Sequence, residues 1–269
     1  MMNKIRNVAV ITPRCKENLA QVLAFRSRLS LANAELAKNG KQIKLTHYLL
    51  NDGDQSLVES YSNHLVNHET NRGLAYTLVE GYEAVLKIPD LDLIVRIDID
   101  GEHDIGLLPY IISTMEQPKM GQTQVQALYL PVVSSIEGKP RPNYEDVTRD
   151  IAQFGYAVKY PEDQGEVIRG LYNQRFPLGY QVYYPELLRQ ITPDLRRGLT
   201  KFKEITGKEP TWGLDLLAIL LAAKSAPIDF IFGGWMKPWE ANRSPQKDLD
   251  QAERAKVMLQ IFDDIKNNT

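Results

Sequence analysis

Short apolar runs alternate with longer segments of helical spacing over the first half of the chain, and this alternation is the feature that most limits the fold. The apolar runs are rich in β-branched residues and cover 8–12, 43–50 and 91–98. Residues 17–40 and 71–87 repeat apolar side chains at three- and four-residue steps, which predicts helices. Strands that alternate with such helices form a mostly parallel sheet covered by helices. We therefore expect an α/β fold.

The second half of the chain is less regular and is expected to complete the same domain. Its pattern predicts, in order, a strand, a buried helix, a strand and a final helix, at 125–133, 213–224, 228–234 and 248–266. The sequence contains no internal repeat and no low-complexity linker. We therefore predict a single domain over 1–269, made of a first half, a second half and a C-terminal helix, at 1–115, 116–247 and 248–269.

Charge and composition argue against several functional classes. The 32 Lys and Arg residues nearly balance the 34 Asp and Glu residues, so no global field attracts nucleic acid or anionic lipid. The single cysteine, Cys15, cannot form a disulfide within the chain, which suits a reducing compartment. The longest apolar run, 216–223, is shorter than the roughly 18 residues of a transmembrane helix, and the N-terminus lacks the apolar core of a signal peptide. We expect a cytoplasmic protein without a transmembrane segment or a nucleic-acid partner.

Polar side chains follow each predicted strand of the first half. These clusters cover 12–17, 51–56 and 98–104, and a short helix is expected after the second of them. Open parallel sheets bind ligands beyond the carboxyl ends of their strands. The three clusters are therefore predicted to converge on one cleft.

The third cluster, "IDIDGEHD", carries an unusual density of acidic residues directly after an apolar strand. Side chains alternate across a strand, so Arg96, Asp98 and Asp100 are expected on one side. Two neighbouring carboxylates repel each other unless a cation lies between them, and oxygen ligands suit Mg²⁺ or Mn²⁺. Glu102 could supply a third oxygen. The alternative is a solvated turn in which Asp104 caps the following helix.

Four motifs in order resemble the family 2 glycosyltransferases of the GT-A fold. They are an apolar strand into "VITP", then "NDGD", then "NRG" at a helix start, then "IDIDGEHD", and the last is closest to the polyprenol-phosphate sugar transferases. The resemblance covers 6–115 well and the remainder loosely. It implies a GT-A sheet, a nucleotide-diphosphate sugar donor, a divalent metal and transfer to an acceptor hydroxyl with inversion. The acceptor could be a sugar, a small molecule or a lipid phosphate met at the inner face of a membrane.

The resemblance assigns the donor contacts to residues at the first three motifs. Thr12 matches the position at the end of the first strand that approaches the nucleotide, although Pro13 and Arg14 replace the residues usual after it. Asp52 matches the acidic residue that recognises the nucleobase. Alternatively, Asp52 has only a structural role in a turn. Asn71, Arg72 and Gly73 match the motif beside the nucleotide, with a plain helix start as the alternative.

The resemblance also implies which residues bind the metal and which one acts as the base. Asp98, Asp100 and Glu102 match the metal-binding motif, with glutamate in place of the usual glutamine, and His103 matches the histidine that follows. Asp215, after "TWG", matches the acidic residue at a helix start that serves as general base. Its alternative role is to favour the helix dipole from the first turn.

The segment 233–247 is expected to form a lid over the donor diphosphate, because it combines glycines, tryptophans and basic residues in a loop. Trp235, Arg243 and Lys247 are its candidate contacts. The tryptophans could instead pack against the C-terminal helix. Aromatic and basic residues of 134–190, Tyr180 among them, are expected to shape the acceptor site.

Three other functions share parts of this pattern. A haloacid-dehalogenase-type phosphatase would use Asp98 as nucleophile and Asp100 as acid and base, but usually on the first strand of the chain. A sugar nucleotidyltransferase should open with a glycine-rich loop, which 12–19 lacks. A non-catalytic nucleotide-sugar-binding protein would keep the cleft, and only Asp215 argues against it.

Overall fold

The computed structural model describes most of the first half of the chain, the strands of the second half and the C-terminal helices. The described residues are 5–14, 17–53, 63–99, 103–116, 128–132, 135–136, 179–210, 213–225, 228–232, 235–236 and 245–267. In 128–132, 135–136, 228–232, 235–236 and 245–253, and at 223 and 255, the description covers the main chain alone. Within these residues no helix is long and apolar enough to span a membrane.

A seven-stranded sheet forms the centre of the molecule, with the strand order β3-β2-β1-β4-β7-β5-β8. β1, β2, β3 and β4 are parallel to one another, and β7 runs antiparallel between β4 and β5. β5 and β8 are parallel, as are the two short strands β6 (Ser135–Ile136) and β9 (Trp235–Met236) of a separate ribbon. The strands of the main sheet are β1 (Asn7–Arg14), β2 (Lys44–Asp52), β3 (His64–His68), β4 (Leu93–Ile97), β5 (Leu128–Val132), β7 (Tyr180–Tyr183) and β8 (Ile228–Phe232).

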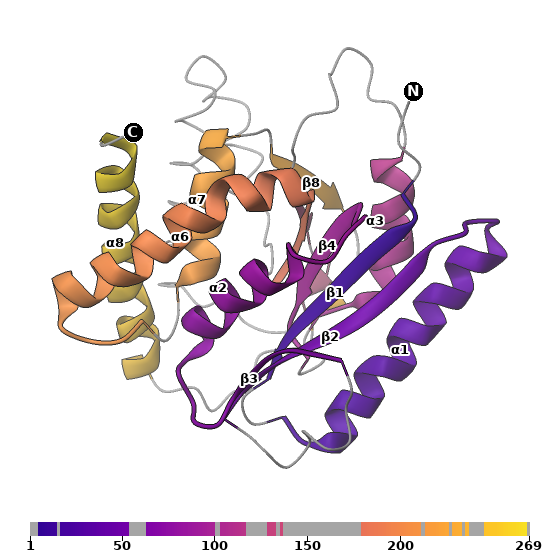
Figure 1. Ribbon diagram of the computed structural model, residues 1–269, viewed down its shortest axis with the longest axis horizontal. Coiled ribbons are helices and arrows are strands. Elements are labelled where there is room, and N and C mark those ends of the chain that lie inside the picture. Colours follow the sequence, from indigo (N-terminus) through magenta and orange to yellow (C-terminus); the bar gives the residue numbers. More distant parts are fainter. Residues whose placement is uncertain are drawn as a thin grey trace.

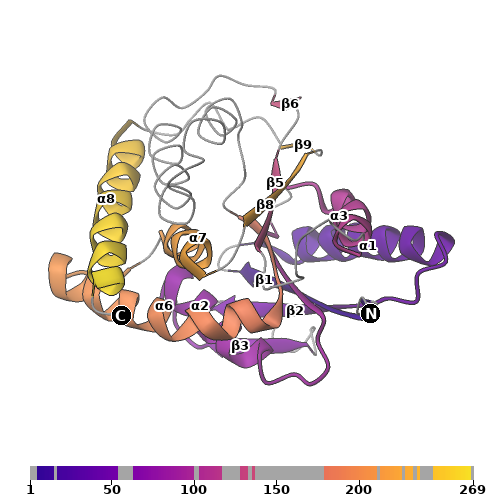
Figure 2. The same cartoon turned by 90° about the horizontal axis from the view of Figure 1, so that it is seen from above.

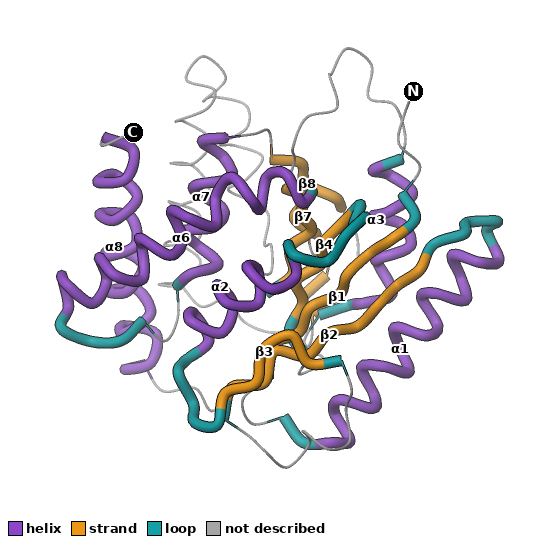
Figure 3. Tube along the Cα trace, in the orientation of Figure 1, coloured by secondary structure: helices purple, strands orange, loops and turns teal. Residues whose placement is uncertain are grey.

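Helices cover both faces of this sheet (Figures 1 and 2). One layer contains α1 (Leu19–Lys38) and α3 (Leu108–Met115), the latter preceded by the 3₁₀ turn η2 (Ile105–Leu107). The other layer contains α2 (Leu74–Val85), α6 (Pro185–Thr206), α7 (Leu214–Ser225) and α8 (Pro245–Asn267). Figure 3 shows the strands lying between these two groups of helices. The expected mostly parallel sheet with helices on its faces is confirmed.

The alternation of side chains along β1 explains why both faces are covered. Ala9 and Ile11 point into the core shared with α2, α6, α7 and α8, whereas Val8 and Val10 point into the core shared with α1 and α3. All four side chains are buried, with exposures of 0–1%. A strand with apolar residues on both faces is stable only when both faces are packed.

Five of the described elements were not anticipated from the sequence, namely β3, β6, β7, β9 and α6. β6 and β9 are strands of two residues in segments that were expected to be loops. β3 and β7 are short strands of four or five residues that contain histidine, asparagine, glutamine and tyrosine, so their pattern is weak. α6 is an amphipathic helix that contains a proline, Pro193, in its interior. The short helix expected after 51–56 falls outside the described residues. The predicted order of elements was therefore wrong at β3, which lies between the second and third expected strands.

Candidate functional site

A buried arginine joins two carboxylates at the carboxyl end of β4. The Nη2 atom of Arg96 lies 2.9 Å from Oδ1 of Asp98, and its Nε atom lies 3.3 Å from Oδ1 of Asp215. The other oxygen of Asp98 lies 3.4 Å from Nε2 of His103. The Arg96 side chain is 1% exposed, and those of Asp98 and Asp215 are 29% and 12% exposed. The structure therefore brings together Asp98, His103 and Asp215, all three singled out in the sequence. The cation among them is the guanidinium of Arg96.

Different elements supply these side chains. Arg96 belongs to β4, and Asp98 follows the end of that strand, where its main-chain N–H donates to the carbonyl of Gly179. Asp215 lies in the first turn of α7, which packs on the same face of the sheet as α2 and α6. Arg96 and Asp215 are 119 positions apart in the chain. Only the tertiary fold places them together.

Burial and charge act against each other in this cluster. Burial by itself would lower the pKa of Arg96, but Asp215 and Asp98 raise that pKa further, so the guanidinium stays charged. Burial also opposes ionisation of Asp98, yet Arg96 and His103 hold the pKa of its carboxyl below the usual value. Burial raises the pKa of Asp215 to about 6, although Arg96 opposes that rise. At neutral pH Asp215 is ionised, but it accepts a proton more readily than an ordinary aspartate.

Gly179, immediately before β7, is the residue that allows the cluster to close. A Cβ atom at this position would overlap Oδ2 of Asp98, Nε2 of His103 and Nη1 of Arg96. Three polar side chains thus converge on the space left by one missing methyl group. The sequence offered no signal for this role.

We expect Gly179→Ala to destabilise the protein by about 1–3 kcal/mol, the usual cost of overpacking a filled interior. The new methyl group must push Asp98, His103 or Arg96 away, so the cluster should open as well. Chemical denaturation of the variant and the wild type measures the loss. Gly207→Ala is a comparison without such contacts, because no atom lies within 4 Å of a Cβ there, although its φ of +68° adds backbone strain. Equal stability of Gly179→Ala and the wild type would contradict the close packing.

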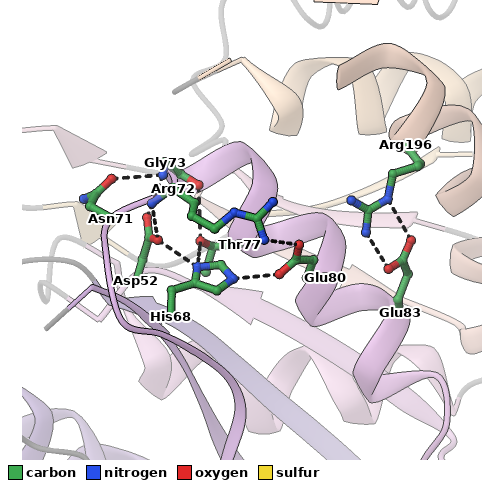
Figure 4. A network of polar contacts seen from close by, with 9 residues as sticks. All are labelled: Asp52, His68, Asn71, Arg72, Gly73, Thr77, Glu80, Glu83 and Arg196. Carbon is green, nitrogen blue, oxygen red and sulfur yellow. Dashed lines mark hydrogen bonds and ion pairs between the residues drawn. The ribbon is translucent and has the colours of Figure 1, made fainter. Parts of the chain in front are cut away.

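A second polar cluster closes the loop between β3 and α2 (Figure 4). Oδ1 of Asp52 accepts hydrogen bonds from the main-chain N–H of Arg72 at 2.8 Å and from Nδ1 of His68 at 2.9 Å. Its Oδ2 accepts from the N–H of Gly73 at 2.9 Å, and the same N–H also donates to Oδ1 of Asn71 at 2.9 Å. Asp52 is 3% exposed. Its carboxylate therefore holds the loop that contains the Asn-Arg-Gly motif.

His68 continues this network toward α2. Its Nε2 lies 2.6 Å from Oε2 of Glu80, and Nη1 of Arg72 lies 2.7 Å from the other oxygen of the same carboxylate. Thr77 lies 3.3 Å from Nδ1 of His68. Figure 4 shows these side chains in one row along the start of α2. His68 was not anticipated from the sequence, because it belongs to no motif and the strand that it ends, β3, was not expected either.

The two clusters lie at the same edge of the sheet. β2 and β4 are separated by β1 alone, and adjacent strands are about 4.8 Å apart, so their carboxyl ends are roughly 10 Å apart. The predicted convergence of the strand-end clusters on one edge is thus consistent with the order and direction of the strands.

Thr12 occupies a different environment from the one expected. Its side chain is fully buried in the sheet, and Oγ1 lies 2.7 Å from Nε2 of His47. Burial lowers the pKa of His47 to about 3, so this pair is a neutral hydrogen bond within the core. Tyr180, one of the residues expected to shape the acceptor site, is likewise 1% exposed inside the sheet. The expected approach of Thr12 to a nucleotide stays a prediction.

Several predicted site residues lie outside the description. Asp100 and Glu102 are not among the described residues, and neither is Arg243; of Trp235 and Lys247 the main chain alone is described. Among the described parts of the chain, no group of three or more His, Cys, Asp or Glu side chains is placed to hold a metal ion. The expected metal ligands and lid contacts therefore stay predictions.

No protein-family model and no curated protein matches this sequence. Among solved structures, the chain is similar to mannosyl-3-phosphoglycerate synthase from Rubrobacter xylanophilus, with a TM-score of 0.52 and 13% sequence identity. That alignment covers 96% of this chain and 73% of the other. A putative protein from Aquifex aeolicus VF5 aligns with 85% of this chain and 87% of its own length, at a TM-score of 0.34 and 9% identity.

The likeness to the synthase extends over nearly the whole chain and includes the central sheet. At this level of identity it shows the fold. The α/β fold expected from the sequence, a GT-A-like mostly parallel sheet flanked by helices, is therefore confirmed.

Proposed function

We propose that this protein is a glycosyltransferase that moves a sugar from a nucleotide-diphosphate donor to an acceptor hydroxyl, with Asp215 as general base and inversion at the anomeric carbon. The observation that carries this proposal is the cluster at the end of β4. There, α7 brings Asp215 to the same guanidinium that contacts Asp98 of the Asp-x-Asp motif. The fold supports the proposal, because a GT-A-like sheet is shared with a mannosyl-3-phosphoglycerate synthase.

The donor is proposed to bind across the carboxyl edge of β1, β2 and β4, in the half formed by 1–115. Asp52 and the loop of Asn71, Arg72 and Gly73 form one end of this edge. Since the oxygens of Asp52 already hold that loop, we propose that this residue shapes the nucleobase site and that neighbouring main-chain groups contact the base. Thr12 would approach through its main chain at the end of β1. Trp235, Arg243 and Lys247 are proposed to cover the diphosphate.

A divalent ion, Mg²⁺ or Mn²⁺, is proposed as cofactor. The donor set fits such an ion, because Asp98, Asp100 and Glu102 offer carboxylate oxygens and the Asp98 side chain keeps 29% exposure. Asp98 is shared with Arg96 and His103, so we assign the main contact to Asp100. When bound, the ion would neutralise charge on the leaving diphosphate.

The catalytic step follows from the chemistry of Asp215. The acceptor oxygen attacks the anomeric carbon, the bond from that carbon to the diphosphate oxygen breaks, and the hydroxyl proton passes to the Asp215 carboxylate. Attack from the side opposite the leaving group inverts the configuration. Arg96 keeps Asp215 ionised at neutral pH, although burial makes it more basic than an ordinary aspartate.

A panel of nucleotide-diphosphate sugars, each with Mg²⁺ or Mn²⁺, tests this function. A transferase releases nucleoside diphosphate in step with glycosylated acceptor, and 3-phosphoglycerate belongs in the acceptor panel because of the similar synthase. A phosphatase that used Asp98 would release inorganic phosphate, and a binding protein would release neither. Calorimetry of Asp100→Ala should show the loss of metal-dependent nucleotide affinity. Unchanged affinity in the presence of Mn²⁺ would contradict the metal role.

The pH dependence of transfer should report the protonation of Asp215. Its pKa is raised to about 6, and a general base works only when ionised. We expect kcat/KM to fall about tenfold per pH unit below about 6 and to level off above it. Initial rates at low donor concentration measure this profile. The residual activity of Asp215→Asn should lack the acid limb, and a wild-type rate that does not change between about pH 4.5 and about 7 would contradict the assignment.

A further inference from the structure

Gln181 contacts the base from the strand beside Arg96. β4 and β7 pair in antiparallel register, with Arg96 directly opposite Gln181. Gln181 is fully buried, and its Nε2 atom donates to the main-chain carbonyl of Asp215 at 3.3 Å. Two side chains on neighbouring strands therefore contact the same residue of α7, one at its carboxylate and the other at its main chain.

A third residue fixes the orientation of the Gln181 amide. The hydroxyl of Tyr183 donates to Oε1 of Gln181. Burial raises the pKa of Tyr183 well above its ordinary value, so this hydroxyl keeps its proton. A carbonyl can only accept, so Nε2 must face Asp215 while Oε1 faces Tyr183. The amide is thus held with its donor toward α7.

By itself, the ion pair with Arg96 would hold the Asp215 carboxylate only loosely. Its contacts to Asp215 measure 3.3 and 3.4 Å. Charge-assisted hydrogen bonds of this type are usually about 2.7–2.9 Å long. The helix also begins next to Gly213, whose φ of +95° marks a sharp change of chain direction. A second anchor on the main chain restricts the movement that this joint and this long ion pair leave open.

We propose that Gln181 is a positioning residue that holds the first turn of α7 so that the Asp215 carboxylate faces the acceptor hydroxyl. The proposal rests on the proposed function of Asp215 and extends it to a residue of β7. A base displaced by about 1 Å can lose up to about a hundredfold in rate. Loss of the Gln181 contact leaves the ion pair with Arg96 in place and allows a smaller displacement, for which we expect about a tenfold loss in kcat with little change in the KM for donor.

The test is Gln181→Met, which keeps the volume of the side chain and removes both polar atoms. We expect kcat to fall about tenfold and the KM for donor to stay within about twofold of the wild-type value. The loss in kcat should occur only when Asp215 is present. Thr192→Val is the matched control. It removes a buried hydrogen bond from Thr192 to the Leu188 carbonyl in α6, and it should lower stability while leaving kcat unchanged.

A double-mutant cycle shows whether Gln181 acts through Asp215. In the Asp215→Asn background, Gln181→Met should change the residual rate by less than about twofold, because there is no base left to position. Equal losses in both backgrounds would overturn the positioning role and leave the role of Asp215 standing. A near-normal rate of Asp215→Asn alone would instead contradict the proposed function. If Gln181→Met does not fold, Tyr183→Phe replaces it in the cycle. We then expect kcat to fall about threefold when Asp215 is present and to stay unchanged in the Asp215→Asn background.

Discussion

Asp215→Asn is expected to lower the rate of sugar transfer by about a hundredfold or more and to leave nucleotide binding intact. The amide has nearly the shape of the carboxylate but cannot accept the acceptor proton. Asp215 also belongs to α7 rather than to β1, β2 or β4, the strands whose carboxyl ends are proposed to bind the donor. Donor affinity should therefore change little, and the loss should fall on kcat.

Steady-state transfer assays measure the rate, and calorimetry with the nucleoside diphosphate measures binding. Asp264→Asn provides a matched control, because it neutralises a carboxylate on α8 that pairs with Lys201 at 3.1 Å. That variant should transfer sugar at the wild-type rate. A near-normal rate of Asp215→Asn would remove this residue from the mechanism, and a parallel loss of nucleotide affinity would place it at the donor site instead.

Arg96→Met is expected to destabilise the fold by about 3–5 kcal/mol, the usual cost of removing one partner from a buried ion pair. Asp215 would lose the cation that opposes the rise of its pKa, and Asp98 would lose the charge that holds its own pKa low. Both carboxylates would remain near each other in a poorly solvated place. Urea denaturation of the variant and the wild type measures the difference in the free energy of unfolding.

This cost should depend on pH in a defined direction. The Asp215 pKa is raised by folding, so its protonated form favours the folded state; that contribution is complete below about 3.8 and disappears as pH rises through about 6. The Asp98 pKa is lowered, so its contribution exists at higher pH and disappears as pH falls. Without Arg96 the Asp98 contribution is lost and the penalty on ionised Asp215 grows.

Arg96→Met should therefore be less harmful near about pH 5 than near about pH 8. Arg96→Lys, which keeps the charge but not the planar fork, should lie between the wild type and Arg96→Met. The double variant Arg96→Met with Asp215→Asn should recover part of the loss, because one of the two carboxylates is then neutral. A destabilisation that is the same at both pH values would contradict the electrostatic origin.

The donor-side predictions show how far sequence patterns reach. "NDGD" indicated a polar site at the end of a strand and "NRG" a helix start beside the same site, and Asp52, Arg72 and Gly73 do meet. The pattern could not show that the oxygens of Asp52 are already used to hold the loop, because this depends on where the loop of 69–73 returns in space. His68 lacked any motif, yet it joins Asp52 to Glu80.

The cluster at the end of β4 was likewise predicted only in part from the sequence. The alternation along the strand placed Arg96 and Asp98 on one side, and the ion pair between them agrees with that. The metal ion expected at Asp98, Asp100 and Glu102 stays a prediction, whereas the cation that the structure places between Asp98 and Asp215 is Arg96. A periodic pattern in the sequence cannot predict the contact between Arg96 and Asp215, which are 119 positions apart.

The amino-acid sequence by itself determined the layered α/β architecture and the edge of the sheet where polar groups gather. Apolar periodicity is a local property, and it decides which residues of a strand or helix face the core. The tertiary structure alone decided that β7 enters the sheet antiparallel beside β4, and that Arg96 and Gln181 thereby meet Asp215 from adjacent strands. Such contacts depend on long-range pairing and register, because whole elements must pack before side chains remote in the chain can meet.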